Sequence, residues 1–450
     1  MTRITTMGRR PNILYLNSHD TGRFIQPMGH AVRTPHIQAL ADTGVLFRDC
    51  HNAGPTCSPS RAALLTGMLP HSCGMLGLAH RGFALTDQTW SLPHHLRSHG
   101  YRTAAWNMPT NHAMPVRGDE AAAASAFGYD TWLGHDLTTA LEWLATPGEE
   151  PFFASLSWTL THRIGSGFTA KPDPTQYDPR WTQPPPPLPD TPAVRADWAH
   201  FLCDIATWDA QVGLVLAALE RSGRAADTIV VLTTDHGVPF PGMKCNPTVH
   251  GTGVLLVVRG PGGFAGGLAV DHLVSHLDLF PTLCAAAEVP VPERVQGLDL
   301  RPTLQGKPVR AEAHAEVTYH AAYEPWRSLR TKRHLYVRRF GERRVPVLPN
   351  CDESPSKDVR LAAGWASEQL PDEELYDLVR DPAESRNLVD DAAYAAHLRD
   401  LRSRLDTHMR ATADPLLDGP VPLPGGCVTT HPDAPGPAAG VMLTAPRGGS

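Results

Sequence analysis

Three short apolar runs in this chain each lead directly into polar residues that can carry chemistry. The runs are 11–17, 151–158 and 228–232. Unbroken apolar runs of this length, bounded by turn-forming residues, are typical of strands buried on both faces of a parallel sheet. Open α/β sheets bind their ligands beyond the carboxyl ends of such strands. The pattern therefore predicts an α/β fold with a site built from the residues that follow the runs, namely His19, Asp20, His162, Asp235 and His236.

A second constraint is the stretch 56–67, which predicts a helix with a cysteine at its start. Pro59 suits the first turn, an alanine- and leucine-rich run follows, and a glycine ends it. Cys57 then lies at the helix N-terminus, where backbone N–H groups and the helix dipole attract an anion. Arg61, one turn later, can donate two hydrogen bonds to a tetrahedral oxyanion. We therefore expect a sulfate or phosphate site. The alternatives are a cysteine buried in an ordinary helix and the thiol of a Cys-His hydrolase.

The pattern along the chain predicts two domains and a tail. With 450 residues, the chain is long enough for one large domain with a smaller appendage. Residues 11–305 alternate between apolar runs and helix-compatible segments, and we expect them to form the catalytic domain. Residues 306–412 change to short strands followed by a helix, which indicates a subdomain with a small antiparallel sheet. Residues 413–450 are rich in proline and glycine, and we expect a disordered or loosely packed tail.

Composition argues against several classes of function. The formal net charge of −6 disfavours a general nucleic-acid binder. No stretch approaches the roughly 18–20 apolar residues of a membrane span. The first residues lack the apolar core of a signal peptide, so we expect a cytoplasmic protein without a membrane partner. The eight cysteines form no CxxC pair and are too sparse for a disulfide framework, which favours reduced thiols.

One segment departs from the acidic balance of the chain. Residues 327–344 hold eight lysines or arginines and a single acid, Glu342. Such a run is either a solvated basic hairpin or a rim that attracts an anionic substrate. The sequence leaves both interpretations open.

The motif Cys57-x-Pro59-Ser60-Arg61, followed by Leu65-Thr66-Gly67, resembles the signature of the type I sulfatases, a family within the alkaline phosphatase superfamily. In that family the cysteine is oxidised after synthesis to formylglycine, an aldehyde that hydrates to a geminal diol. The resemblance covers residues 11–410. It implies a large central, mostly parallel sheet flanked by helices, and a smaller C-terminal α+β subdomain that carries an antiparallel sheet. Several scaffold stretches, such as 187–197 and 238–241, look closest to the heparan N-sulfatases (sulfamidases).

The resemblance also implies a metal site. Sulfatases bind a divalent cation, here expected to be Ca²⁺, through two aspartates after the first strand, an Asp-His or Asp-Asn pair after a later strand, and the modified cysteine. The ligands carried over are Asp20, Asp235, His236 and the formylglycine made from Cys57. His19 stands where the family has an aspartate, and imidazole is a poorer ligand than carboxylate for a hard Ca²⁺ ion. His19 therefore ligates, hydrogen-bonds the diol, shifts the metal preference, or has only a structural role.

Further positions carry over as catalytic residues. Arg61 is expected to hold the diol, His162 to act as general acid, and Lys244 to bind a sulfate oxygen and stabilise the leaving group. The same three residues are the expected substrate-binding residues. The family's Gly-Lys-x-His element is incomplete, because its lysine is missing near Met108. His112 replaces the histidine of that element if two residues are inserted, and is otherwise a surface-loop residue.

These features together predict an enzyme that hydrolyses a sulfate ester or sulfamate through a formylglycine nucleophile and a divalent metal. The expected substrate is a small sulfated sugar such as N-sulfoglucosamine, and maturation requires a formylglycine-generating enzyme. The first alternative is a phosphonate or phosphate-diester hydrolase of the same superfamily, because such enzymes share the Cys-x-Pro-Ser-Arg motif and tolerate changes in the first metal pair. The second is an unmodified, non-catalytic sulfate-binding relative. The oligomeric state stays open.

Overall fold

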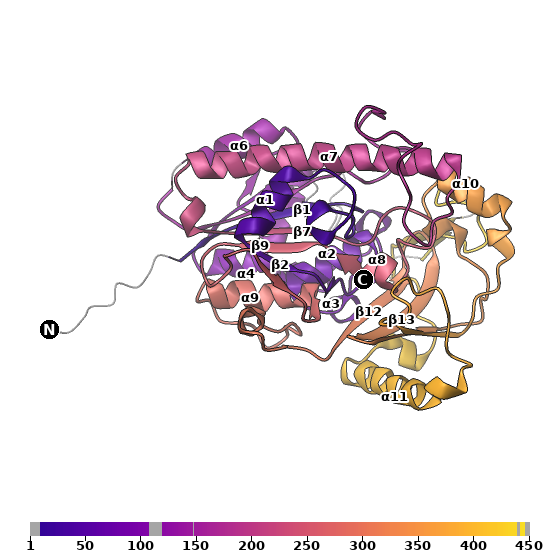
Figure 1. Ribbon diagram of the computed structural model, residues 1–450. Coiled ribbons are helices and arrows are strands. Elements are labelled where there is room, and N and C mark those ends of the chain that lie inside the picture. Colours follow the sequence, from indigo (N-terminus) through magenta and orange to yellow (C-terminus); the bar gives the residue numbers. More distant parts are fainter. Residues whose placement is uncertain (1–9, 108–118, 147, 439–441, 446–450) are drawn as a thin grey trace.

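The larger part of the molecule is built on one mixed sheet. The computed structural model describes residues 10–107, 119–146, 148–438 and 442–445. Eight strands form the sheet in the order β10-β2-β9-β7-β1-β6-β4-β5, and within the described ranges only β9 runs antiparallel to its neighbours (Figure 1). The predicted mostly parallel sheet is therefore confirmed. The strands are β1 Asn12–Ser18, β2 Val45–Phe47, β4 Arg102–Trp106, β5 Thr131–Trp132, β6 Phe152–Ser157, β7 Thr228–Thr234, β9 Leu256–Arg259 and β10 Leu268–Val270.

β1 lies in the middle of this sheet, and this position explains why its central residues, 13–16, form an unbroken apolar run. It pairs in parallel with β6 on one side and with β7 on the other. Ile13 and Tyr15 point into one core, whereas Leu14 and Leu16 point into the other. Because both faces of the strand are buried, residues 13–16 are all apolar, and the alternation of a half-exposed strand is absent.

Helices cover both faces of the sheet. α1, α6 and α7 pack on one face, and α2, α4 and α9 pack on the other (Figure 1). The helices are α1 Pro35–Thr43, α2 Cys57–Thr66, α3 Pro70–Cys73, α4 Leu92–Ser98, α5 Glu120–Phe127, α6 Leu137–Ala145, α7 Pro192–Arg221, α8 Val249–Thr252, α9 Leu279–Ala286, α10 Pro355–Ala362 and α11 Ala395–Ala411.

α7 is the longest of these helices and lies along the sheet. Among the described residues it is the one helix whose length and apolar composition would allow a membrane crossing, which differs from the expectation that no stretch approaches the length of a membrane span. The qualifying window is 61% buried inside the molecule, as expected for a core helix. Asp209 of α7 accepts hydrogen bonds from the backbone N–H groups of His36 and Ile37 at the start of α1. Its carboxylate thus joins two helices.

α2 begins at Cys57 and ends at Thr66, as the sequence predicts. Gly67 follows at φ 66°, the left-handed conformation that glycine adopts with little strain. All ten residues of the helix are buried. Ser60, in its first turn, donates a hydrogen bond of 2.5 Å to the carbonyl oxygen of Asp235, just beyond β7. The N-terminus of α2 is therefore fixed against the carboxyl edge of the sheet.

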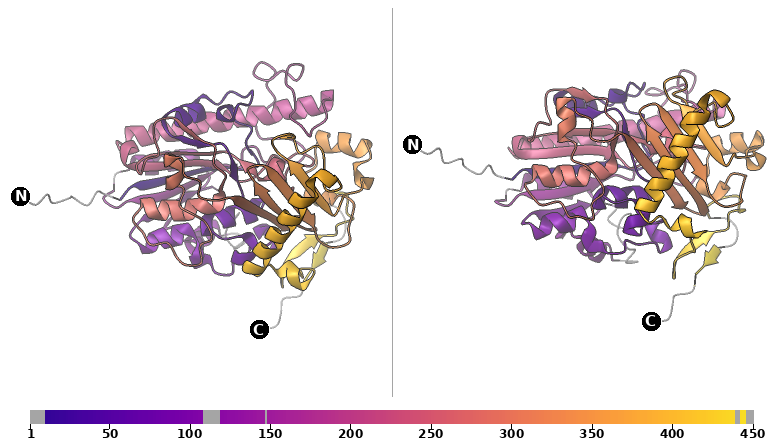
Figure 2. Two further views of the ribbon diagram at one scale, coloured as in Figure 1. Left: turned by 60° about the horizontal axis from the view of Figure 1, so that its bottom comes forward. Right: turned by 90° about the horizontal axis from the view of Figure 1, so that it is seen from below.

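A four-stranded antiparallel sheet forms the smaller part of the molecule, as predicted. α11 lies across this sheet (Figure 2) and begins at Ala395, after a 3-10 turn at Ala392–Tyr394. The strands of the sheet are β12 Glu312–Tyr319, β13 Tyr323–Thr331, β14 His334–Arg339 and β15 Glu373–Asp377. A small three-stranded sheet consists of β3 Cys50–His51, β8 Gly253–Val254 and β11 Val274–Ser275.

The basic run 327–344 is a set of ion pairs in this sheet and the loop that follows it. Each of its eight cations has a carboxylate oxygen within 3.2 Å. Arg327 is buried and donates two hydrogen bonds to Asp414. Acids from distant parts of the chain neutralise the run, so neither a solvated hairpin nor an attractive rim describes it.

The described part of the tail is packed, so the expectation of a disordered or loosely packed tail is wrong there. Val421 and Cys427 are buried, and β16 (Val428–Thr430) pairs with β17 (Met442–Thr444). The backbone N–H of Thr430 donates a hydrogen bond of 2.7 Å to the carbonyl oxygen of Ala321. A proline- and glycine-rich composition disfavours long regular elements, but it does not prevent an irregular segment from binding to a folded surface.

The buried ion pair between Arg163 and Asp197 is a position where we expect a substitution to destabilise the fold strongly. Arg163, after β6, donates two hydrogen bonds to Asp197 of α7, at 2.9 and 2.8 Å, and Ser356 of α10 donates to the same carboxylate. Asp197→Ala leaves a buried guanidinium unpaired and should lower the free energy of unfolding by about 3–5 kcal/mol. Urea unfolding measures this loss. Asp190→Ala, which removes the exposed partner of Arg195, is the control and should have little effect; equal losses in both variants would contradict the assignment.

A second prediction concerns acid stability. The rings of His314 on β12 and His408 on α11 stack with centroids 3.4 Å apart. Burial and the neighbouring His314 lower the pKa of His408 to about 3. Between this value and the usual pKa of about 6.5 the unfolded chain binds more protons, so stability falls as the pH is lowered through that range. His408→Phe should make the urea midpoint depend less on pH between 6.5 and 4. An unchanged slope would exclude this source of acid sensitivity.

Candidate active site

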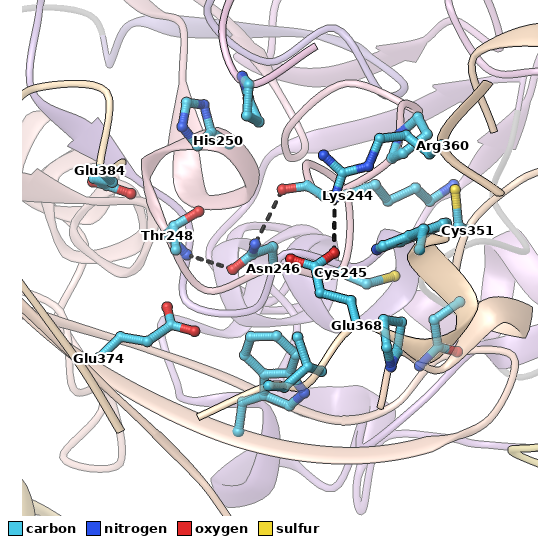
Figure 3. A pocket seen from close by; sticks show the side chains of 18 of the residues that line it. Lys244, Cys245, Asn246, Thr248, His250, Cys351, Arg360, Glu368, Glu374 and Glu384 are labelled. Carbon is cyan, nitrogen blue, oxygen red and sulfur yellow. Dashed lines mark hydrogen bonds and ion pairs between the residues drawn. The ribbon is translucent and has the colours of Figure 1, made fainter. Parts of the chain in front are cut away.

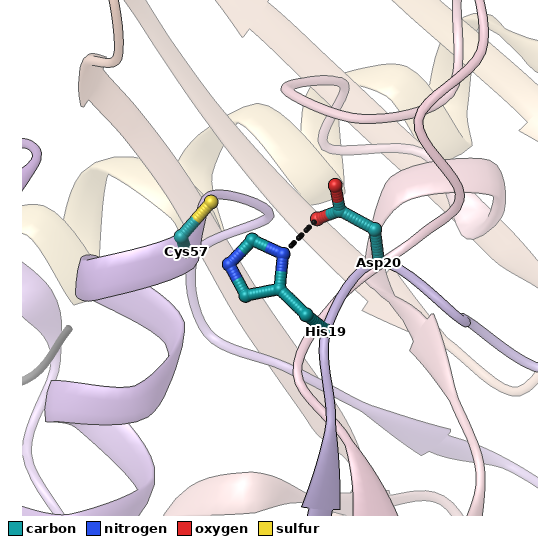
Figure 4. A group of neighbouring side chains, drawn as sticks. All are labelled: His19, Asp20 and Cys57. Carbon is teal, nitrogen blue, oxygen red and sulfur yellow. Dashed lines mark ion pairs between the residues drawn. The ribbon is translucent and has the colours of Figure 1, made fainter. Parts of the chain in front are cut away.

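Residues that are far apart in the sequence meet at the carboxyl edge of the sheet. His19 and Asp20 follow β1, His162 follows β6, and Asp235 and His236 follow β7. Cys57, at the N-terminus of α2, faces them, with the ring of His19 between its thiol and Asp20 (Figure 4). A cavity of approximately 440 Å³ opens above this cluster. Its lining includes His19, Cys57, His80, Arg81, His162, Lys244, His320, Ala321, Asp352 and Pro437.

The backbone at this edge is held in a conformation that non-glycine residues rarely adopt. Asp20 has φ 55° and Thr161 has φ 73°, both in the left-handed region. The N–H of Asp20 donates to Oδ1 of Asp235 at 2.8 Å, and the N–H of Thr161 donates to Asp204 at 3.0 Å. Such strain persists only where surrounding contacts enforce it, and it is common at functional sites. Here it aims Asp20 and His162 at each other.

The carboxylate of Asp20 lies at the centre of the cluster. Its Oδ1 is 3.0 Å from Nε2 of His236 and 3.2 Å from Nδ1 of His19. Its Oδ2 is 2.7 Å from Nδ1 of His162 and 3.0 Å from Nζ of Lys244. Burial alone would raise the pKa of Asp20, but Lys244 and the surrounding histidines hold it well below the usual range. Asp20 is therefore ionised under all ordinary conditions.

The donors in this cluster fit a divalent metal ion. Asp20, Asp235 and His236 form one group whose ligand atoms lie within 4.8 Å of one another, and His19, Asp20 and Cys57 form another. Oδ1 of Asp20 and Oδ2 of Asp235 are buried and lack a hydrogen bond of acceptable geometry, although Nε2 of His236 lies 3.0 Å from the first and Nη2 of Arg61 lies 2.8 Å from the second. A buried, unsatisfied carboxylate oxygen is costly unless a cation offsets its charge. Carboxylate oxygens with one or two imidazoles are a donor set that metals such as Ca²⁺, Mn²⁺ or Zn²⁺ accept.

Arg61 lies beside the same carboxylates. Nη2 is 2.8 Å from Oδ2 of Asp235, yet all three guanidinium nitrogens lack a hydrogen bond of acceptable geometry. The side chain is 1% exposed, and it is not among the described residues that line the cavity. Arg61 thus lies behind the cavity surface, on the same helix as Cys57, and its positive charge stabilises the carboxylate of Asp235.

Two cations act on the thiol of Cys57. Burial raises its pKa, but Lys244 and His19 outweigh burial and hold the thiol pKa well below its usual value. Burial also opposes the charge of Lys244, whereas Asp20 and Asp352 raise its pKa well above the ordinary range. Lys244 therefore remains an ammonium group at neutral pH and places a fixed positive charge over the cavity floor.

The structure adds site residues that the sequence analysis missed. Oδ2 of Asp352, from the C-terminal subdomain, accepts a hydrogen bond of 3.1 Å from Nζ of Lys244. His320, just after β12, is buried in the cavity wall, and its pKa is lowered mainly by burial. Neither residue follows a strand of the large sheet, so strand-end reasoning could not find them. His112 lies outside the described residues.

A second pocket adjoins the site at Lys244 (Figure 3). It has a volume of approximately 280 Å³ and lies between the loop 241–250 and the C-terminal subdomain. Its polar groups are largely satisfied within the protein. Glu384 accepts a hydrogen bond from the N–H of Val249, and Arg360 donates to Glu368 at 3.2 Å. These contacts join the subdomain to α8 and to its own loops.

This arrangement defines a class of protein. A helix N-terminus facing clustered aspartates and histidines, at the carboxyl edge of a mixed α/β sheet, is an arrangement suited to metal-assisted hydrolysis, and the fold around it is alkaline phosphatase-like. Solved structures support the fold. The phosphonate monoester hydrolase of Agrobacterium radiobacter superposes with a TM-score of 0.67 at 21% identity, covering 90% of this chain and 96% of that one. A protein solved in complex with its substrate, D-glucosamine-2-N,6-O-disulfate, superposes with a TM-score of 0.64 at 16% identity, covering 92% and 99%.

Sequence comparison identifies the family within that class. The family model described as Sulfatase matches residues 11–289. The chain is 32% identical over 445 residues to N-sulphoglucosamine sulphohydrolase of Homo sapiens, covering 87% of this chain and 88% of the relative. The chain therefore belongs to the sulfatase family, as its motifs predict, and it is a hydrolase of sulfate esters or sulfamates. This family generally uses a metal ion and a formylglycine.

The assignment of the metal donors can be tested by binding. In Asp235→Asn the side chain keeps an acceptor for the backbone but loses the charge that would hold a cation. Millimolar Ca²⁺ should stabilise the wild-type protein and raise its thermal midpoint. At a Ca²⁺ concentration 100 times the dissociation constant, the free energy of unfolding should rise by about 2.7 kcal/mol. The variant should lose most of this shift. Asp352→Asn, which changes a half-buried carboxylate of the same cavity outside the metal groups, should retain it; loss of the shift in both variants would contradict the assignment.

Proposed function

We propose that this sulfatase releases sulfate from a small N-sulfated sugar, with N-sulfoglucosamine as the leading substrate, and that Cys57 acts after conversion to formylglycine. The observation that carries the proposal is the floor of the cavity, where Cys57, His162 and Lys244 converge on Asp20. The cavity volume of approximately 440 Å³ falls within the range of about 300–1,000 Å³ that encloses small ligands. The substrate class is supported by the similarity to the human N-sulphoglucosamine sulphohydrolase and to the protein solved in complex with D-glucosamine-2-N,6-O-disulfate.

The proposed reaction requires a formylglycine and a divalent cation at this site. A formylglycine-generating enzyme would make the formylglycine from Cys57. Asp20, Asp235, His236 and the modified Cys57 would hold the cation, Ca²⁺ or a similar ion. The hydrated aldehyde would supply an oxygen nucleophile, and the cation would offset negative charge on the sulfate. His19 lies within reach of Asp20 and Asp235, and we propose that it adds a nitrogen donor to this site.

His162 is the residue we assign to proton transfer. Its side chain is 37% exposed to the cavity, and its Nδ1 hydrogen-bonds to Asp20, which fixes the ring orientation. When the ring is protonated, Nε2 is free to give its proton to a leaving amine or alkoxide. Lys244, in contrast, is held as an ammonium between Asp20 and Asp352, so it acts as a fixed charge on the sulfate.

A second candidate, hydrolysis of a phosphonate or phosphate diester, is favoured by one observation. His19 replaces a carboxylate in the first metal pair, which makes the cluster less negative, and the fold also matches a phosphonate monoester hydrolase. Parallel assays with N-sulfoglucosamine, an aryl sulfate and a phenyl phosphonate ester discriminate between these activities. A phosphonate turned over more efficiently than every sulfate would replace our proposal.

The modification and its role can be tested on one peptide. After coexpression with a formylglycine-generating enzyme, the tryptic peptide that contains residue 57 should lose about 18 Da in mass, the difference between cysteine and formylglycine. Cys57→Ser should lower kcat by about a thousandfold or more, as expected for loss of a nucleophile. Cys203→Ser, a thiol away from the cavity, should retain activity. An unmodified Cys57 in a fully active enzyme would overturn the proposal.

A further inference from the structure

The C-terminal tail reaches the active-site cavity. Pro437 is part of the cavity lining, together with Arg81 and Ala321 of the preceding domains. The tail is fixed before it arrives there. The hydroxyl groups of Tyr319 and Tyr323 hydrogen-bond to both backbone groups of Val421, at 2.8 and 3.0 Å. The sequence had indicated a loose appendage, whereas the structure places this segment at the mouth of the site.

Arg81 holds the tail on one side of the cavity. Its Nη1 donates to Oγ1 of Thr430 at 3.1 Å, and its Nη2 donates to the carbonyl oxygen of Pro437 at 3.0 Å. Thr430 in turn donates from its hydroxyl to the same carbonyl at 2.8 Å. The three groups form a closed set of hydrogen bonds, which we call the Arg81 clamp. Because Arg81 and Pro437 both line the cavity, the clamp fixes the distance between two of its walls.

The opposite side of the tail supports the wall next to Cys57. The hydroxyl of Thr429 and the N–H of Thr430 both donate to the carbonyl oxygen of Ala321, at 2.9 and 2.7 Å. Ala321 lies beside His320, and both line the cavity. Gly82, next to Arg81, approaches the tail so closely that a Cβ there would lie 2.8 Å from the carbonyl oxygen of Gly426. The tail therefore braces two walls of the cavity and forms part of a third.

We propose that residues 420–438, held by the Arg81 clamp, are a specificity-determining wall that limits the enzyme to substrates whose sulfated group is small or terminal. A tail bound in this way cannot yield to a bulky neighbour of the sulfated ring without breaking partly buried hydrogen bonds of the clamp and the buried bond from Thr429 to Ala321. The part of this inference that concerns sugars rests on the proposed function. The wall itself depends only on cavity shape, so it applies to any sulfate ester that the enzyme hydrolyses.

The test compares substrates of different bulk on the full-length, formylglycine-containing enzyme. Thr430→Val removes the hydroxyl of the clamp at nearly constant volume, and Pro437→Ala removes ring carbons from the cavity wall. Thr444→Val, the same substitution at an exposed position of β17, is the matched control. Each enzyme is assayed with 4-nitrophenyl sulfate and a bulkier aryl sulfate, and with N-sulfoglucosamine and a trisaccharide whose N-sulfated residue is internal.

Both cavity variants should raise the ratio of kcat/KM for the bulky substrate to that for the small one by about tenfold, the scale on which a pocket discriminates one carbon group. The control should keep the wild-type ratio. Unchanged ratios in a folded Pro437→Ala enzyme, or an equal rise in Thr444→Val, would contradict the proposal that the tail determines specificity. If the wild-type enzyme hydrolyses aryl sulfates but no N-sulfated sugar, the proposed substrate fails, while the aryl series still decides whether the wall exists.

Discussion

The carboxylate of Asp20 is the contact on which the rest of this site depends. It is buried and ionised, and its two oxygens lie against side chains brought by three different strands and by the loop after β7. One oxygen faces the imidazoles of His19 and His236, and the other holds His162 and Lys244. A single negative charge thus divides the cluster into a side suited to a metal and a side suited to proton transfer and sulfate binding.

Much of this architecture is readable from the sequence, because it follows from local patterns. Runs such as 11–17 and 151–158 are largely apolar and lack the alternation of a half-exposed strand, since both faces of their strands are buried, and this predicts a parallel sheet with its site at the carboxyl edge. The helix from Cys57 to Thr66 is predicted by its proline and glycine signals. Asp20, Asp235 and His236 are found because they directly follow strands.

Other features depend on contacts that no local pattern encodes. Asp352 reaches Lys244 from more than a hundred residues away in sequence, through docking of the subdomain on the loop after β7. The basic run 327–344 has a local excess of charge, but its partners are acids from elsewhere, such as Asp414 and Asp433. The tail was expected to be loose from its composition, yet its packing is decided by the surface that receives it. Charge and disorder are properties of the folded environment as much as of the segment.

The complete burial of α2 has a consequence for the order of events during synthesis. All ten residues from Cys57 to Thr66 are enclosed once the sheet and its helices have assembled. A modifying enzyme that must read Cys57, Pro59 and Arg61 cannot reach them in the finished molecule. Conversion to formylglycine, as proposed, therefore has to precede folding, and rapid folding competes with maturation. If Cys57 is converted as proposed, the fraction of active protein would be set by the competition between modification and folding, so slower folding or a lower expression temperature would give more active enzyme from the same sequence.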